Sequence, residues 1–373
     1  MKPFKILILL FTLAFNEYWS QIKDQEFNPI RDEYLSDNKK QTSLDSAIDN
    51  VLVDYMKSPQ NSGISIGIIK DSTIFYYNYG ETKRNNKTLP SNETLYEIGS
   101  LTNTFCGLIL AIAINEGKIK LEDDIRKYLP GKYSNLETTK SVIHLKHLAN
   151  HTSGFPRIPE NIKDQPNYDS LNPYKNYDKL MIFEYLKNIK LSHEPGQICE
   201  YSTLGIAVLG IILEKVYNKS FDELIKEKIC VPNKMNSTGI SLTEQQNTLL
   251  ANGHNSFGNQ VPHWDLGGFD AAGGIKSSTS DMIKYLTYNL NEEDASTKLA
   301  HQSTFNSREN VALAWQIIKT KFNNQLIWHN GGTFGFSSFC GFIPQKKCAL
   351  IILSNSAVNV DYIALSILKF LQK

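Results

Sequence analysis

The sequence has almost no excess of charge of either sign, because 39 Lys and Arg residues stand against 38 Asp and Glu residues. No basic cluster interleaved with aromatic residues occurs, which argues against a nucleic-acid partner. The histidines lack H-E-x-x-H or similar spacing, and no nucleotide or flavin motif is present. The sequence therefore predicts neither a metal site nor a cofactor.

Cysteine is scarce and irregularly placed. The five cysteines show no metal-ligand spacing, and an odd number in a chain this long argues against a disulfide framework. We expect most of them to be core residues. They are Cys106, Cys199, Cys230, Cys340 and Cys348.

Long apolar runs are also missing after the first twenty residues, so no transmembrane anchor is expected in the mature chain. Within those twenty residues, Lys2 and Lys5 precede an apolar run over residues 6–15 and then polar Ser20. This pattern predicts a signal peptide over residues 1–20 and an exported protein, periplasmic or secreted. A retained N-terminal anchor is the alternative. Residues 21–42 are polar and are predicted to be a tether.

The remaining residues, 43–373, have the composition of a globular domain. The whole chain is 41% apolar and 21% charged over 373 residues, which allows one large unit or two lobes. Apolar spacing predicts a helix from Ser43 to Met56, and two alternating runs joined at Asp71-Ser72 predict a β-hairpin.

Strand patterns return near the C-terminus, over residues 325–328, 336–343 and 348–354, and a final helix follows to Leu371. Helical patterns dominate between residues 100 and 268, interrupted by loops at 155–178 and 231–262. The predicted fold class is α/β (α+β): an antiparallel sheet formed from both termini and flanked by helices, with an inserted, mainly helical domain. The sheet lobe comprises residues 43–99 and 270–373, and the helical lobe comprises residues 100–269.

Ser100 begins the helix that the apolar spacing predicts, which ends near Gly117. A serine at a helix start can be an ordinary N-cap, but it can also be a nucleophile supported by the helix dipole. The residue one turn later, Asn103, lies on the same helix face.

Five stretches that resemble a known family follow one another in the family's order. They are Tyr96-Glu97-Ile98-Gly99-Ser100, Leu148 to Pro156 with its H-T-S-G-x-P ending, Pro195-Gly196 with Tyr201-Ser202-Thr203, Ala272 to Ser278, and His329-Asn330-Gly331-Gly332-Thr333. Together they resemble the serine β-lactamase and penicillin-binding-protein superfamily, in particular its class C-like branch. The resemblance covers nearly the whole mature chain and implies a sheet domain packed on a helical domain, with the site between them.

The resemblance implies a role for each matching residue. Ser100 would be the nucleophile that forms an acyl-enzyme, and Tyr201 would be a second acid/base, although it could also be a core tyrosine. The backbone N–H groups of Ser100 and Gly332 would form the oxyanion hole. Asn103, Thr203, Asn330, Gly331 and Thr333 would contact the substrate.

Two of these positions depart from the family pattern. The family carries Lys where this chain has Asn103, and Asn where it has Thr203. An amide takes up no proton near neutral pH, so we expect Asn103 only to accept a hydrogen bond from Ser100. Loss of a positioned base typically costs about 10²–10⁴-fold in rate.

His329 is the candidate to replace the missing lysine, since a histidine with an ordinary pKa titrates near neutrality. We expect a relay between Tyr201 and His329; the alternative is a structural histidine. His151 is expected to order its loop, and Lys276 to be a surface residue.

Two functions remain open from the sequence. The first is an exported serine hydrolase, acting through a Ser100 acyl-enzyme on an ester, a D-amino-acid peptide or a β-lactam. The H-x-G form of the last motif favours esterase or carboxypeptidase chemistry over a dedicated β-lactamase. The second is a non-catalytic homologue that binds cell-wall peptides or is an envelope scaffold. The expected partner is a small-molecule or peptide substrate, including a peptidoglycan stem peptide, and no pattern indicates an oligomeric state.

Overall fold

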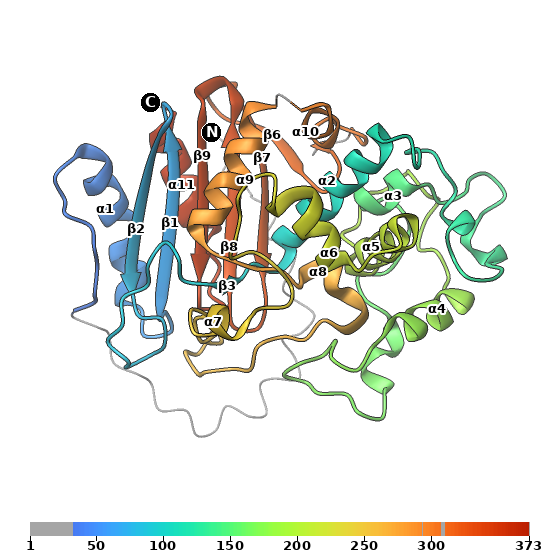
Figure 1. Ribbon diagram of the computed structural model, residues 1–373, viewed down its shortest axis with the longest axis horizontal. Helices are drawn as coiled ribbons and strands as arrows, with labels where there is room; N and C mark the ends of the chain where they lie inside the picture. The colour runs from blue at the N-terminus through green and yellow to red at the C-terminus, as the bar shows by residue number, and fades with distance from the viewer. Residues whose placement is uncertain (1–32, 293, 307–309, 373) are drawn as a thin grey trace, which may run out of the picture. The chain divides into compact units, whose positions relative to one another are not determined.

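An antiparallel sheet forms one side of the protein in the computed structural model, which describes residues 33–372 except 293 and 307–309 (Figure 1). Its seven strands lie in the order β2-β1-β9-β8-β7-β6-β5. The strands are β1 Gly63–Lys70, β2 Thr73–Gly80, β5 Asn310–Val311, β6 Gln316–Lys319, β7 Gln325–Gly332, β8 Ser337–Ile343 and β9 Cys348–Ser354. Because β1 pairs with β9, the two ends of the described chain complete one sheet, which confirms the predicted fold class.

The hairpin between β1 and β2 turns at the predicted residues. Asp71 and Ser72 both have positive φ, 49° and 65°, which suits the right-handed twist of the strands that a two-residue turn joins. The helix α1, Ser43–Lys57, is also confirmed, and a capping box between Thr42 and Asp45 fixes its start.

Helices cover both faces of the sheet. On one face α1 and the C-terminal helix α11, Asp361–Leu371, bury their apolar stripes against β1 and β9. On the other face α9, Thr279–Asn291, packs on β9, β1 and β8. A two-stranded sheet of β3, Tyr96–Glu97, and β4, Lys276–Ser277, lies beside the main sheet.

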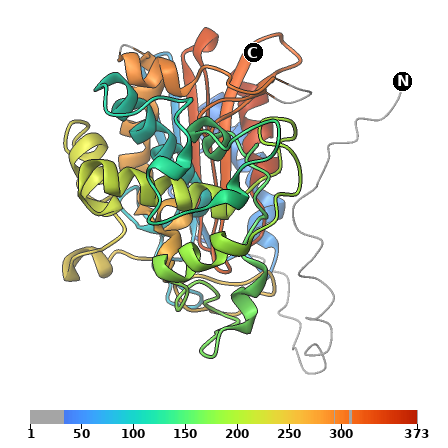
Figure 2. The same cartoon turned by 90° about the vertical axis from the view of Figure 1, so that its right-hand side faces the viewer.

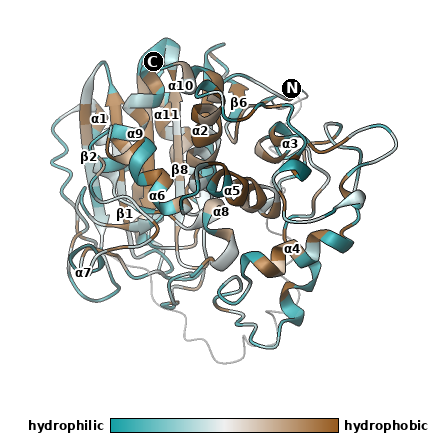
Figure 3. Cartoon of the chain, turned by 45° about the vertical axis from the view of Figure 1, so that its right-hand side comes forward, coloured by the Kyte–Doolittle hydropathy of each residue, from teal (hydrophilic) through white to brown (hydrophobic). Residues whose placement is uncertain are grey.

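The helical part lies beside the sheet and is turned toward the viewer in Figure 2. Its elements are α2 Thr102–Asn115, α3 Leu145–Ala149, α4 Lys179–Asn188, α5 Thr203–Tyr217, α6 Phe221–Ile225 and α8 Asp270–Gly273, and α10 Ala295–Ala300 packs on α2. The short helix α7, Glu244–Asn247, lies apart from them, near the lower ends of the strands in Figure 1. The sequence predicts an amphipathic α2, but the structure buries α2 on nearly all sides. Figure 3 shows why: α2 and α5 are largely hydrophobic, whereas α4 has a hydrophilic face as well.

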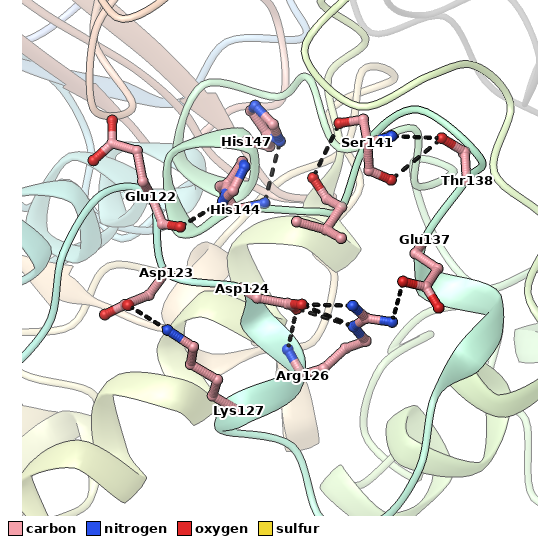
Figure 4. A network of polar contacts seen from close by, with 11 residues as sticks. Glu122, Asp123, Asp124, Arg126, Lys127, Glu137, Thr138, Ser141, His144 and His147 are labelled. Atoms are coloured by element: carbon pink, nitrogen blue, oxygen red, sulfur yellow. Dashed lines mark hydrogen bonds and ion pairs between the residues drawn. The ribbon is translucent and has the colours of Figure 1, made fainter.

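Polar contacts rather than long helices hold the segment between α2 and α3 (Figure 4). The Arg126 guanidinium donates to the Asp124 carboxylate at 2.7 Å and pairs with Glu137 at 2.8 Å. Further along, the His144 backbone N–H donates to Nδ1 of His147 at 3.2 Å. This segment leads into α3, which precedes the H-T-S-G loop at residues 151–154.

Part of the predicted tether is attached to the sheet. Ser36 forms a bridge with Tyr79 on β2, and the Asp37 carboxylate accepts from the backbone and side chain of Asn78 at 2.8 and 2.6 Å. The Asn38 amide donates to the Tyr79 hydroxyl at 2.6 Å. The prediction of a tether through residue 42 is therefore corrected, since the chain is anchored at residues 36–38.

The predicted signal peptide lies outside the described residues. Within residues 33–372, gaps aside, no helix combines the length and the apolar character needed to cross a membrane. Four of the five cysteines are buried, as predicted for core residues, and Cys199 is exposed.

Candidate active site

The candidate site begins at the turn that joins β3 to the buried helix α2. A short 3₁₀ helix, η2 Gly99–Leu101, precedes α2, and the backbone N–H of Ile98 donates to Ile275 at 3.1 Å. Gly99 has a φ of +52°, a conformation that favours glycine. The turn leaves Ser100 only partly buried, at the N-terminal end of the α2 segment.

The end of β7 lies directly against this turn. A Cβ on Gly99 would come within 2.6 Å of the Gly332 nitrogen, and a Cβ on Gly331 within 3.0 Å of the Ser100 nitrogen. The Ser338 hydroxyl on β8 donates to the Ile98 carbonyl at 2.8 Å and ties the turn to the sheet. The structure thus brings the predicted oxyanion-hole residues, Ser100 and Gly332, together.

Tyr201 lies beside the serine. Its phenol accepts a hydrogen bond from the Asn103 amide nitrogen at 2.7 Å and is also hydrogen-bonded to Ser100. Burial raises the pKa of Tyr201 above its ordinary value, while the hydrogen bonds from Ser100 and Asn103 and the charge of Arg157 oppose the increase. Tyr201 is therefore a neutral phenol at neutral pH.

Asn103 differs from the prediction in what it contacts. The sequence predicts an amide that accepts from Ser100, but in the structure its Nδ2 donates to Tyr201. The side chain is completely buried. Asn103 therefore makes the kind of hydrogen bond that a lysine ammonium would make to the phenol, without the positive charge.

Two histidine rings flank Tyr201. Their ring centroids lie 4.4 Å (His151) and 6.4 Å (His329) from that of the tyrosine. Burial lowers the pKa of His151 to about 3 and that of His329 to about 4. Both rings are neutral near pH 7, so the expectation that His329 titrates near neutrality is corrected.

The tautomer of His329 follows from its hydrogen bond. Nδ1 donates to the Asn330 carbonyl at 2.6 Å, which leaves Nε2 as an acceptor. A neutral His329 can thus accept a proton but cannot supply the positive charge of the missing lysine.

His151 orders its loop, as predicted, and also contacts the start of α5. It adopts a φ of 59°, its Nδ1 accepts from the Ser202 N–H at 3.3 Å, and its carbonyl accepts from Glu200 at 2.8 Å. Ser202 caps α5 through Gly205. These contacts fix the backbone on both sides of Tyr201.

Not every predicted substrate residue joins the site. Asn330 donates to Asp361 of α11 at 2.8 Å, so its side chain lies on the opposite face of the sheet from His329 and we withdraw it from the site. Thr333 closes the turn after β7, where its N–H donates to Phe336 at 3.0 Å. Thr203 is the first residue of α5 and is half-buried. Lys276 donates to the Ile240 carbonyl at 3.2 Å.

Sequence reasoning misses one residue of the site, Arg157. Its guanidinium carbon lies 5.2 Å from the centroid of the Tyr201 ring, in cation–π range. Arg157 directly follows the H-T-S-G-F-P stretch, so its closeness to a recognised motif was the only feature that could have drawn attention to it. The sequence gives no indication that this position lies over the tyrosine.

Comparison with known proteins gives consistent matches. The chain matches the family described as Beta-lactamase over residues 48–372. A Beta-lactamase of Providencia stuartii is 28% identical over 353 residues, which cover 84% of this chain and 87% of that protein. Protein flp of Staphylococcus aureus (strain N315) is 27% identical over 331 residues and 85% of this chain. The chain spans 64% of the length of that relative.

Solved structures agree in fold. A Beta-Lactamase/D-Alanine Carboxypeptidase from Pseudomonas syringae has a TM-score of 0.76 at 24% identity, over 88% of this chain and 99% of the other. An octameric penicillin-binding protein homologue from Pyrococcus abyssi also has a TM-score of 0.76, at 26% identity, over 88% of this chain and 76% of the other.

The contact between β7 and the Ser100 turn predicts unequal effects of alanine at two adjacent glycines. Gly331→Ala places a methyl group 2.3 Å from the Ile98 carbonyl oxygen. The methyl group of Gly332→Ala has the Phe336 carbonyl oxygen, 3.4 Å away, as its nearest neighbour. We expect Gly331→Ala to lower the melting temperature and to reduce the labelling rate of Ser100 by at least about tenfold. Gly332→Ala should be close to wild type in stability. Thermal unfolding and fluorophosphonate labelling measure both. Equal behaviour of the two variants would contradict the packing described.

Proposed function

We propose, since the chain belongs to the beta-lactamase family, that it is a serine hydrolase acting through a Ser100 acyl-enzyme. The observation that carries the proposal is the placement of the Tyr201 phenol between the Ser100 hydroxyl and the Asn103 amide. The close approach of β7 to the Ser100 turn supports the proposal, because it brings the backbone of Gly332 near that of Ser100, as an oxyanion hole would need.

The proposed reaction has two halves. Ser100 Oγ attacks the substrate carbonyl carbon, and its proton passes to the Tyr201 oxygen in its ionised form. The N–H groups of Ser100 and Gly332 bind the oxyanion, and the leaving group then takes the proton from Tyr201 as the tetrahedral intermediate collapses. Water then attacks the resulting acyl-enzyme ester, with Tyr201 taking the proton of the water and returning one to the Ser100 oxygen.

Asn103 has a defined part in this scheme. Its amide nitrogen donates to the phenol oxygen at 2.7 Å, and this bond favours the ionised form of Tyr201. Because it brings no charge, the favourable effect is smaller than that of an ammonium group. The scheme therefore predicts a slow hydrolase rather than an inactive one.

The favoured substrates are esters and D-amino-acid peptides, with β-lactams less favoured. The strand next to the site carries His329 where a K-T-G lysine would stand, and that ring is neutral near pH 7. The site therefore offers less attraction to a substrate carboxylate than a lysine would. Export to the periplasm or the medium, which would give access to peptidoglycan stem peptides, is part of the proposal.

One observation favours a second candidate, a non-catalytic homologue that binds cell-wall peptides or is an envelope scaffold. The groups around Ser100 that could accept its proton are a phenol of raised pKa and two histidines of lowered pKa. A site with this composition can bind a peptide without cleaving it. Covalent labelling separates the two candidates.

The proposal predicts a covalent adduct at Ser100. Incubation with a neutral fluorophosphonate at about pH 6 to 9 should add one label, detected by intact mass, because the phosphonyl group needs only the nucleophile and the oxyanion hole. Ser100→Ala should abolish the label, and Ser72→Ala, on the exposed hairpin turn, should keep it. Absence of label at every pH would favour the binding candidate.

Restoring the missing charge should increase the rate. Asn103→Lys places an ammonium group next to Tyr201, and we expect p-nitrophenyl ester turnover to rise about tenfold or more. Asn103→Met, of similar length and without charge, is the control for the larger volume in this completely buried position. Equal turnover of the two variants would mean that charge at this position does not limit the reaction.

The lowered pKa of His329 predicts the pH profile. His329 is neutral above its pKa of about 4 and gains a proton only as the pH falls through that value. Labelling of Ser100 should therefore show no inflection near pH 6.5 and should rise toward alkaline pH with the ionisation of Tyr201. Tyr201→Phe should remove the alkaline rise. An inflection at about pH 6 to 7 that His329→Gln abolishes would contradict this assignment.

A further inference from the structure

Arg157 is the residue near Tyr201 whose charge is fixed at every working pH. Its guanidinium carbon lies 5.2 Å from the centre of the Tyr201 ring. An arginine keeps its proton throughout the pH range in which proteins are stable. The groups that face Tyr201 from the surrounding elements are Ser100, Asn103, His151, Arg157, Tyr174 and His329. Arg157 alone among these six is a cation near pH 7.

The backbone around Arg157 is fixed to the element that carries Tyr201. The Arg157 carbonyl accepts from the Leu204 N–H at 3.1 Å, and the Pro156 carbonyl accepts from the Ser202 hydroxyl at 2.7 Å. Both donors lie within three positions of Tyr201, at the start of α5. The backbone of Arg157 is therefore held next to Tyr201 by hydrogen bonds to the first residues of α5.

Within the described part of the chain, no carboxylate competes for the guanidinium. Across residues 33–372, leaving aside 293 and 307–309, none lies within ion-pair distance of Arg157. An unneutralised cation on the face of an aromatic ring stabilises negative charge that develops on that ring's oxygen. The exposed side chain loses part of this effect to solvent and salt.

We propose that Arg157 is a positioning residue for the nucleophile: its guanidinium, stacked on Tyr201, supplies the positive charge that Asn103 does not carry. The inference rests on the proposed function, in which ionised Tyr201 takes the Ser100 proton. It assigns the electrostatic role of the lysine that the family carries at position 103 to Arg157, which lies in the loop after residues 151–154. Asn103 keeps the hydrogen bond to the phenol, and Arg157 keeps a charge beside it.

The decisive measurement is the ionisation of Tyr201 itself, which does not require hydrolysis. Phenolate absorbance is titrated in the full chain and in its Tyr201→Phe variant. The difference between the two curves isolates Tyr201 from the other 17 of the 18 tyrosines. We expect Arg157→Gln to move this transition upward by about 0.5 to 1 pH unit. Arg157→Lys should move it by less than half of that. The difference between wild type and Arg157→Gln should shrink at about 1 M salt.

Ser100 labelling by a neutral fluorophosphonate supplies the second readout. Arg157→Gln should lower the labelling rate about 3- to 10-fold near pH 7, and Arg157→Lys should restore most of it. Lys346→Gln, at the turn after β8 at the end away from Ser337, is the control for a general change in net charge.

The two readouts separate failure of the inference from failure of the proposed function. An unchanged Tyr201 transition in Arg157→Gln overturns the inference, whether or not Ser100 is labelled. Equal losses of labelling in Arg157→Gln and Arg157→Lys, with an unchanged transition, also overturn it and indicate a packing or substrate contact. A shifted transition in a chain that never labels supports the electrostatic contact while the hydrolase proposal fails.

Discussion

The close approach of two backbone segments governs the rest of the structure. Gly331 on β7 packs against Ile98 and the Ser100 nitrogen so tightly that any side chain at that position would collide. This contact joins the sheet to the first buried helix and brings the backbone of β7 next to the serine. The Ser338 hydroxyl bond to Ile98 holds the same junction from the next strand. Stability and the geometry of the candidate site therefore depend on one set of contacts.

Much of the fold could be predicted from the sequence because local patterns determine it. Alternating apolar residues and the Asp71-Ser72 turn specify the β1–β2 hairpin, and apolar spacing specifies α1. The burial of α2 on nearly all sides could not be predicted in this way, because it depends on α5, α8 and α10 packing against it. The anchored residues 36–38 were also missed, since polar side chains that bind a strand edge resemble a linker in composition.

The candidate site could be located from the sequence but not interpreted in full. Motif order was sufficient to predict that Ser100, Tyr201 and Gly332 belong together. His329 is neutral because it is buried, which the sequence does not show. Asn330 does not belong to the site because its side chain lies on the other face of β7. Arg157 belongs to no motif, and only the three-dimensional fold brings it over Tyr201. What sequence reasoning lacks is the solvent exposure and the facing neighbours of each residue.

The attachment of residues 36–38 to β2 also affects how molecules of this protein meet one another. An outer strand with free backbone groups can pair with another chain and begin aggregation. Here the bridge from Ser36 to Tyr79 and the Asp37 contacts with Asn78 occupy part of the outer side of β2. At the other margin, the described part of β5 is Asn310–Val311, which pairs with β6. Residues 36–38 thus occupy part of the edge of the sheet at which a strand from a second molecule could otherwise add.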